Sequence, residues 1–191
     1  MNEDFLIEDA EKAITVLQQG GIILYPTDTI WGLGCDATNA NAAEKIIALK
    51  QRPSNKSFVV LVASEKDILK YTASPDLAVF DYLKTTQKPT TVIYEHALGV
   101  AENVCNNDGS IAIRICSDEF CRYIIKRFQK PLVSTSANLS GELSAGNFLE
   151  ISNTIKQGVD YIVQYKQQDK SLGTASSIIR WEKGKAQIIR P

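Results

Sequence analysis

The sequence predicts an α/β protein of one domain, built on an open mixed sheet with flanking helices. Short apolar runs, such as residues 22–25 and 58–63, have the length of buried strands. Segments with apolar residues at helical spacing, such as 8–19, alternate with these runs. The length of 191 residues suits one domain, and no repeat or low-complexity linker divides it. Strands and helices mixed in this way are typical of an α/β open sheet, which we expect to span residues 1–191.

Glycine, proline and capping residues set the predicted ends of these elements. Gly20 and Gly21 end the first helix, and Pro26 ends the next strand because proline has no N–H for a ladder. Ser64, with Asp67 three residues later, predicts the capped start of a short helix. The other predicted elements are helices over 41–50, 75–84 and 148–156, a helix after the cap Ser117, a loop over 27–40, strands over 58–63, 91–94, 111–116, 131–134 and 161–165, and a C-terminal hairpin.

Composition excludes several function classes. Twenty-one Lys and Arg against 22 Asp and Glu give a net charge of −1, which argues against nucleic-acid binding driven by overall charge. The single histidine, His96, argues against a His-rich metal site or a His pair. Four cysteines without CxxC spacing predict reduced thiols in a cytoplasmic protein. The acidic N-terminal segment and the short apolar runs predict neither a signal peptide nor a membrane helix.

Three polar segments follow apolar runs, and strand ends are where open α/β sheets bind ligands. Residues 25–29 with nearby glycines supply hydroxyls and approachable amides, although a self-bonded turn has the same composition. Residues 50–56 gather cations that suit a polyphosphate, although cations at a helix end are also favoured by the helix dipole. Residues 134–141 are rich in hydroxyls and amides. Arg114 lies inside a predicted strand, where it either faces solvent at an edge or faces inward toward a carboxylate or phosphate.

The common sequence motifs for phosphate loops, dinucleotide sites and serine nucleophiles are absent from the chain. It has no GxxxxGK[ST], no GxGxxG and no GxSxG, and no serine nucleophile with a histidine partner is readable. Asp28 and Asp36 are carboxylates that can contact a Mg²⁺ carried by a nucleotide, an arrangement that leaves little trace in a sequence. The remaining chemistry is positioning plus charge neutralisation, which is how nucleotidyl and phosphoryl transfer proceed.

Four segments, in this order and spacing, resemble one family. YPTDTIWGLGCD, LKQRPSNK, SIAIR and KPLVSTSANLSG resemble the YrdC-like threonylcarbamoyl-AMP synthases, and the resemblance covers residues 8–190. It implies a twisted YrdC/RibB-like sheet with a central, concave, positively charged cavity. It also implies an activity: L-threonine, bicarbonate and ATP with Mg²⁺ give threonylcarbamoyl-adenylate and pyrophosphate. Downstream transfer proteins use that product to make threonylcarbamoyladenosine in tRNA.

The same resemblance assigns roles to single residues. It implies that Lys50 and Arg52 are catalytic and that neither binds a resident metal. It places one group of side chains at the ATP: Arg52, Lys56, Ser110, Ser136, Asn138, Ser144 and Arg190. It places a second group at the threonine, with Arg114 on its carboxylate: Thr29, Arg114, Ser134 and Ser176.

The chain also departs from the family pattern. One proline, Pro89, remains of a WPGPxT-like segment, Cys116 begins the stretch that replaces a Pro or His-Pro pair, and Leu61 replaces a threonine-binding His of some members. Two alternatives therefore stay open at this point. One is a paralogue with another carbamoyl or adenylate substrate, and the other is a protein that binds double-stranded RNA or tRNA through the basic stretch 45–56.

Overall fold

The computed structural model describes residues 3–52 and 58–191. In chain order its elements are α1 (Glu3–Gln18), β1 (Ile23–Tyr25), β2 (Gly32–Gly34), α2 (Ala40–Lys50), β3 (Val59–Val62), α3 (Glu65–Tyr71), α4 (Ala78–Thr85), β4 (Thr90–Tyr94), η1 (Glu102–Val104), β5 (Ile111–Ile115), α5 (Glu119–Phe128), β6 (Leu132–Ser136), η2 (Phe148–Glu150), α6 (Asn153–Gln157), β7 (Tyr161–Ile162), β8 (Ser177–Glu182) and β9 (Lys185–Arg190). Every helix in this described part falls short of the length and apolar character needed to cross a bilayer.

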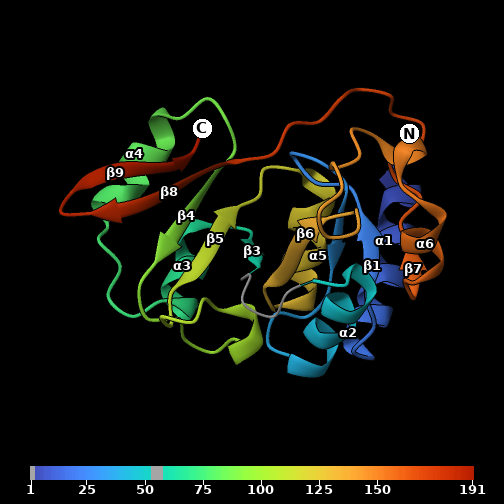
Figure 1. Cartoon of the computed structure of the whole chain (residues 1–191), viewed down its shortest axis with the longest axis horizontal. Coiled ribbons are helices and arrows are strands. Elements are labelled where there is room, and N and C mark those ends of the chain that lie inside the picture. The colour runs from blue at the N-terminus through green and yellow to red at the C-terminus, as the bar shows by residue number, and fades with distance from the viewer. Residues whose placement is uncertain (1–2, 53–57) are drawn as a thin grey trace.

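The strands form one mixed sheet in the order β7-β1-β2-β6-β3-β5-β4-β8-β9. The pairs β1/β7, β3/β5 and β4/β8 are parallel, and the other neighbouring pairs are antiparallel. Figure 1 shows the sheet running across the whole molecule, with the β8–β9 hairpin at one end and β1 and β7 at the other. This arrangement confirms the predicted mixed α/β class, including the C-terminal hairpin.

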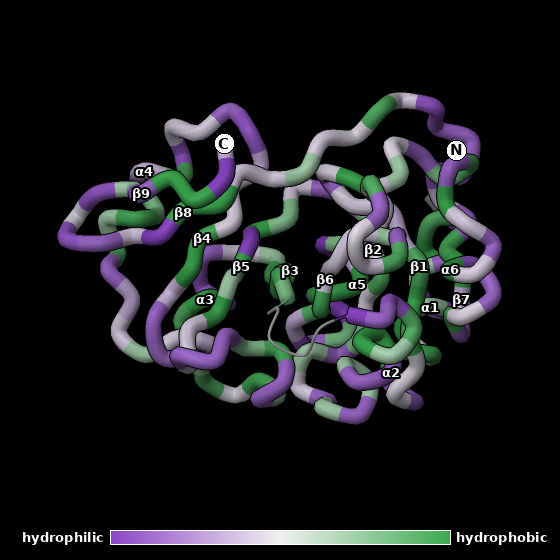
Figure 2. The backbone as a smooth tube through the Cα atoms, in the orientation of Figure 1, coloured by the Kyte–Doolittle hydropathy of each residue, from purple (hydrophilic) through white to green (hydrophobic). Residues whose placement is uncertain are grey.

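Side chains alternate between two packed faces of the sheet, as the pleat requires. Val60 and Val62 of β3 join the apolar cluster that includes α2, α3 and α4, and Leu61 joins the cluster of α1 and α5. Arg114 is the register partner of Leu61, and Ser134 is the partner of Val59, so both belong to the α1/α5 face. Figure 2 shows hydrophobic residues along the central strands and hydrophilic residues at the turn of the hairpin.

The predicted loop over 27–40 was wrong in part, because β2 lies within it. Its two glycines had suggested a loop, but the missing side chain of Gly34 makes room for a neighbouring ring. A Cβ on Gly34 would lie 2.5 Å from Cε1 of Tyr25. Glycine therefore lets β2 pack between β1 and β6 over the Tyr25 ring.

Two predicted helix starts differ in their hydrogen bonds. Asp118, and not Ser117, caps α5, because its Oδ1 accepts from the N–H of Cys121 at 3.0 Å. Ser64 does precede α3, but its hydroxyl donates to Asp67 Oδ2 at 2.8 Å and leaves the backbone amides without a side-chain cap.

Two later elements are shorter than predicted. The helix over 148–156 is interrupted, since Ser152 caps a second helix start by accepting from the N–H of Ile155. The strand over 161–165 ends at Ile162, because Asp9 Oδ2 takes the backbone N–H groups of Gln164 and Tyr165.

Candidate active site

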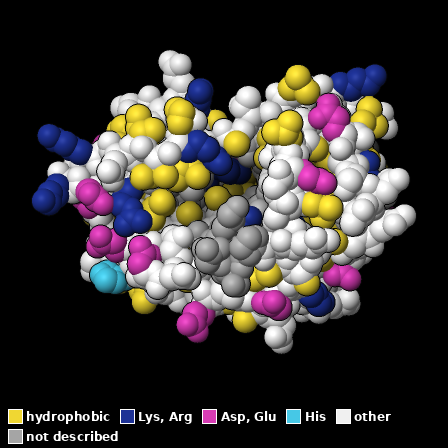
Figure 3. Space-filling model, viewed as in Figure 1, with side chains coloured by type: hydrophobic (Ala, Val, Ile, Leu, Met, Phe, Trp, Pro, Cys, Tyr) yellow, Lys and Arg dark blue, Asp and Glu magenta, His cyan; other side chains and the backbone are white. Residues whose placement is uncertain are grey.

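A cavity of about 240 Å³ brings together most of the residues singled out from the sequence. Its wall is formed by strands β2, β3, β5, β6, β8 and β9 and their adjoining loops. Figure 3, viewed as Figure 1, shows a hollow near the middle of the molecular surface, with Lys and Arg side chains at its border. The predicted site residues that line the cavity are Thr29, Arg52, Arg114, Ser134, Ser136, Ser144, Ser176 and Arg190.

Arg114 faces inward, so the solvent-facing alternative was wrong. It is 4% exposed, in the middle of the sheet and not at an edge. Its Nη2 donates to Oδ1 of Asp28 at 3.0 Å and to Oγ1 of Thr29 at 3.2 Å. Its Nε is buried and has no hydrogen-bond partner among the described residues. Because Arg114 also lines the cavity, its guanidinium offers a binding group for a carboxylate or phosphate.

The hydroxyl of Thr29 has a fixed hydrogen-bond direction. Thr27 Oγ1 donates its single proton to the carbonyl of Ile30 at 2.8 Å, so it can only accept from Thr29 Oγ1, 2.9 Å away. Thr29 Oγ1 therefore donates to Thr27 and accepts from Arg114. What remains for a ligand is an oxygen lone pair, which pairs with an N–H or O–H donor. The structure shows the self-bonded turn of the two alternatives, and this turn lies at the cavity wall. The role of Thr29 in binding a ligand stays a prediction.

Two further guanidinium groups, those of Arg52 and Arg190, line the cavity. Burial lowers the pKa of both side chains, and the charge of Arg114 lowers the pKa of Arg190 further. Arg190 Nη2 donates to the carbonyl of Ser176 at 2.7 Å, and the Ser176 hydroxyl lies 2.8 Å from Oγ1 of Thr91. Over the described residues no carboxylate lines the cavity. Its potential therefore favours an anion.

Lys50 lies beneath the neighbouring loop and does not line the cavity. Its side chain is 1% exposed, and Nζ donates to the carbonyl oxygens of Ser136 and Asn138. Burial, with the nearby charge of Arg52, lowers the pKa of Lys50 to about 8. Because Ser140 N–H donates back to the Lys50 carbonyl at 2.9 Å, the end of α2 and the loop after β6 are joined.

The other assigned residues lie apart from the cavity wall. Asn138 Nδ2 closes its own loop by donating to the carbonyls of Leu139 and Glu142 at 2.9 and 2.8 Å. Ser110 is buried in the turn before β5, where its hydroxyl donates to Asp108 Oδ1 at 2.6 Å. Lys56 falls outside the described residues.

Sequence reasoning missed the segment that covers the Thr29 loop, residues 166–175, called the strap below. Figure 1 shows it crossing the top of the view between β7 and β8. Lys166 Nζ pairs with Asp118 Oδ2 at 2.7 Å at one end, and Gly173 N–H donates to the Gly146 carbonyl at 3.1 Å near the other. Gly173 touches Thr29 so closely that a Cβ there would lie 1.9 Å from the Thr29 carbonyl oxygen. Its glycine was the only signal in the sequence.

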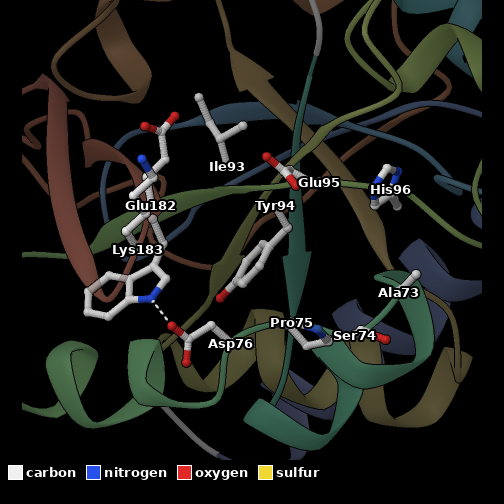
Figure 4. Close-up of a pocket in the computed structure, with 11 residues that line it drawn as sticks. Ala73, Ser74, Pro75, Asp76, Ile93, Tyr94, Glu95, His96, Glu182 and Lys183 are labelled. Atoms are coloured by element: carbon white, nitrogen blue, oxygen red, sulfur yellow. Dashed lines mark hydrogen bonds between the residues drawn. The ribbon is translucent and has the colours of Figure 1, made fainter.

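A second cavity, of about 430 Å³, lies beside the hairpin and has the opposite charge. Figure 4 shows Asp76, Glu95 and Glu182 around it, with one lysine, Lys183. The indole of Trp181, which also lines this cavity, donates to Asp76 Oδ2 at 2.7 Å. Its three carboxylates repel a polyphosphate, so the smaller cavity with three guanidinium groups is the better candidate for an anionic substrate.

Comparison with known proteins shows the family. Residues 15–191 match the Sua5/YciO/YrdC family, described as telomere recombination. This chain belongs to that family. Two family members named Threonylcarbamoyl-AMP synthase are 32% identical over 154 residues in Pseudoalteromonas translucida and 34% over 163 residues in Idiomarina loihiensis. These alignments cover 79% and 84% of this chain and 82% and 85% of the relatives.

Solved structures of the Sua5/YciO/YrdC family share the fold. Sua5 of P. abyssi, complexed with L-threonine, superposes with a TM-score of 0.84 at 20% identity over 95% of this chain and 53% of that chain. E. coli YciO superposes with a TM-score of 0.77 at 21% identity over 95% of this chain and 87% of that chain. The present chain thus spans about half of the Sua5 chain and most of YciO.

Proposed function

We propose that this chain is an L-threonylcarbamoyladenylate synthase. It forms threonylcarbamoyl-AMP and pyrophosphate from L-threonine, bicarbonate and ATP, for the threonylcarbamoyladenosine modification of tRNA. The observation that carries the proposal is one cavity in which Arg52, Arg114 and Arg190 face a wall of hydroxyls. Guanidinium groups bind phosphates and carboxylates through paired N–H donors. Relatives of that name, 32% and 34% identical over most of this chain, support it.

The cavity divides into two halves in this proposal. In the threonine half, the guanidinium of Arg114 binds the carboxylate and the Thr29 lone pair accepts from the ammonium or hydroxyl, with Ser134 and Ser176 beside them. The nucleotide half comprises Arg52, Ser136, Ser144 and Arg190. The assignment of Lys56 to ATP rests on the family resemblance, because Lys56 lies outside the described residues. Ser110 and Asn138 do not line the cavity, so their assignment to ATP rests on the family resemblance alone.

The reaction needs no covalent intermediate on the protein. The threonine amine adds to CO₂ derived from bicarbonate, with loss of water, to give a carbamate. A carbamate oxygen then attacks the α-phosphorus of ATP, and the bond to pyrophosphate breaks. Arg52 offsets charge that develops on the phosphates, and Lys50 contributes as a second cation close to it. Mg²⁺ enters with the ATP as part of the substrate.

The product is an acyl-adenylate type of intermediate, so a second protein must consume it. We propose that tRNA threonylcarbamoyl-transfer proteins do so in the cytoplasm. Direct contact of this chain with tRNA or double-stranded RNA is a further part of the proposal, and retention of tRNA that weakens steeply with salt tests it.

Pyrophosphate release tests the proposed reaction. We expect release only when threonine, bicarbonate and ATP are all present. Arg52→Ala should reduce turnover by about 100-fold or more, since loss of one contact to developing charge costs ~3–4 kcal/mol. Arg127→Ala is the matched control, because that arginine is exposed on α5 and pairs with Glu11. Turnover without threonine, or wild-type rates in Arg52→Ala, would contradict the proposal.

A further inference from the structure

The carboxylate of Asp28 accepts hydrogen bonds from three donors while buried beside the cavity. Its Oδ1 accepts from Arg114 Nη2 at 3.0 Å. Its Oδ2 accepts from the N–H of Ser117 at 3.0 Å and from the Ser117 hydroxyl at 3.2 Å. The side chains of Asp28 and Arg114 are each 5% exposed. Asp28 is thus held by β5 and by the turn that follows it, although 86 residues separate it from Arg114.

This contact fixes how the guanidinium of Arg114 is oriented at the cavity wall. Asp28 and Thr29 both take Nη2 of Arg114, and Nε is left without a partner among the described residues. We propose that Asp28 is a positioning residue that orients Arg114 so that its guanidinium, at the cavity wall, receives the carboxylate of the amino-acid substrate. The inference rests on the proposed function and adds to it a residue that does not itself line the cavity.

The chain contains a matched carboxylate for comparison. Asp36 Oδ1 accepts from the N–H and the hydroxyl of Thr38 at 2.8 and 2.7 Å, and Oδ2 accepts from Lys130 Nζ at 2.6 Å. The side chain of Asp36 is 5% exposed, like that of Asp28, and pairs with one cation and one hydroxyl residue. Neither Asp36 nor its partners line the cavity. Substitution of either aspartate removes the same set of interactions, and only Asp28 is joined to Arg114.

Asp28→Asn is the informative change because an amide has one acceptor oxygen where the carboxylate has two. With that oxygen toward Arg114, the amide N–H₂ meets the N–H of Ser117. In the opposite orientation it meets the guanidinium. Either arrangement places donor against donor in a buried site, so the guanidinium loses its fixed orientation.

The experiment compares binding of L-threonine with binding of L-threoninamide, which lacks the carboxylate, by calorimetry. We expect the ratio of the two affinities to fall at least tenfold in Asp28→Asn and to stay at the wild-type value in Asp36→Asn. Binding of a non-hydrolysable ATP analogue should be unchanged in both, because protein donors occupy both carboxylates and neither aspartate lines the cavity where the Mg²⁺ of a nucleotide would lie. The positioning role is overturned if the ratio is unchanged in Asp28→Asn, or if Asp36→Asn lowers it equally. It is also overturned if Asp28→Asn binds threonine more tightly, which would mean that Asp28 only neutralises charge.

A milder variant covers the case in which Asp28→Asn does not fold. Ser117→Ala removes one of the three donors to Asp28 at an exposed position and keeps the backbone N–H. It should lower the same ratio by a smaller factor, and an unchanged ratio would overturn the proposal. Failure of the proposed function would give a result that differs from failure of the positioning role. Wild-type protein would then bind neither threonine nor the ATP analogue, before any variant is compared.

Discussion

Replacing Gly173 by alanine should weaken the use of threonine and leave the use of ATP nearly unchanged. The strap lies on the Thr29 loop so tightly that the new Cβ would lie 1.9 Å from the Thr29 carbonyl oxygen and 3.2 Å from Ile30 Cγ2. The first of these atoms is backbone, so no side-chain rotation relieves the overlap. Ordinary contact begins at 3.4 Å, and the two segments must therefore separate by about 1.5 Å.

The size of the effect follows from what that separation breaks. Thr29 Oγ1 accepts from Arg114 Nη2 at 3.2 Å, and a further 1 Å would take this contact beyond hydrogen-bonding range. A misplacement of about 1 Å in a substrate-positioning group costs about 100-fold in rate. We therefore expect kcat/KM for threonine to fall by about 100-fold, equivalent to about 2.8 kcal/mol of transition-state stabilisation.

The assay is pyrophosphate release, titrated separately with threonine and with ATP. Gly146→Ala is the control, because its Cβ would meet Leu172 Cδ2 at 2.8 Å. That atom is the end of a side chain that is 72% exposed and free to turn away. The reasoning is refuted if Gly173→Ala folds normally and keeps the wild-type kcat/KM for threonine. It is also refuted if kcat/KM falls equally for threonine and for ATP.

Three further predictions concern charge and burial. The pKa of Lys50 is lowered from 10.5 to about 8 in the folded protein. Between pH 8 and 10.5 the unfolded chain therefore binds more protons than the folded chain. The unfolding free energy in urea should therefore rise from pH 8 to 10.5, and Lys50→Met should flatten that rise. Burial raises the pKa of Cys35, Cys105 and Cys121, but only Cys105 among the four thiols is partly exposed. A thiol reagent at pH 8 should therefore label native protein mainly at Cys105, and all four thiols after unfolding. Arg190→Ala should raise KM for ATP more than KM for threonine, and equal increases would contradict the division of the cavity.

Much of the fold was predictable because its signals are local. The apolar runs of β1, β3 and β5 and the helical spacing of α1 and α5 lie within single segments, so period and length identify them. The motif segments likewise predicted most of the cavity wall. Strand β2 was missed since glycine is a loop signal in a sequence, and only the Tyr25 ring beside Gly34 shows why glycine is needed there.

The parts that escaped prediction depend on contacts between distant segments. An arginine within an apolar strand indicates an anionic partner, but nothing local identifies Asp28 as that partner. The burial of Lys50 also depends on a distant segment. A lysine at a helix end usually reaches solvent, but here the loop after β6 covers it. The strap over Thr29 is set by the packing of Gly173 and leaves no periodic pattern.

The most direct test of the central claim follows the carbon of bicarbonate. Purified protein is incubated with ATP, L-threonine and ¹³C-labelled bicarbonate, and the nucleotide products are analysed by mass spectrometry. The account predicts an adenylate that contains threonine and one labelled carbon, formed in equal amount with pyrophosphate and lost in Arg52→Ala. Pyrophosphate release with no labelled carbon in any adenylate would contradict it.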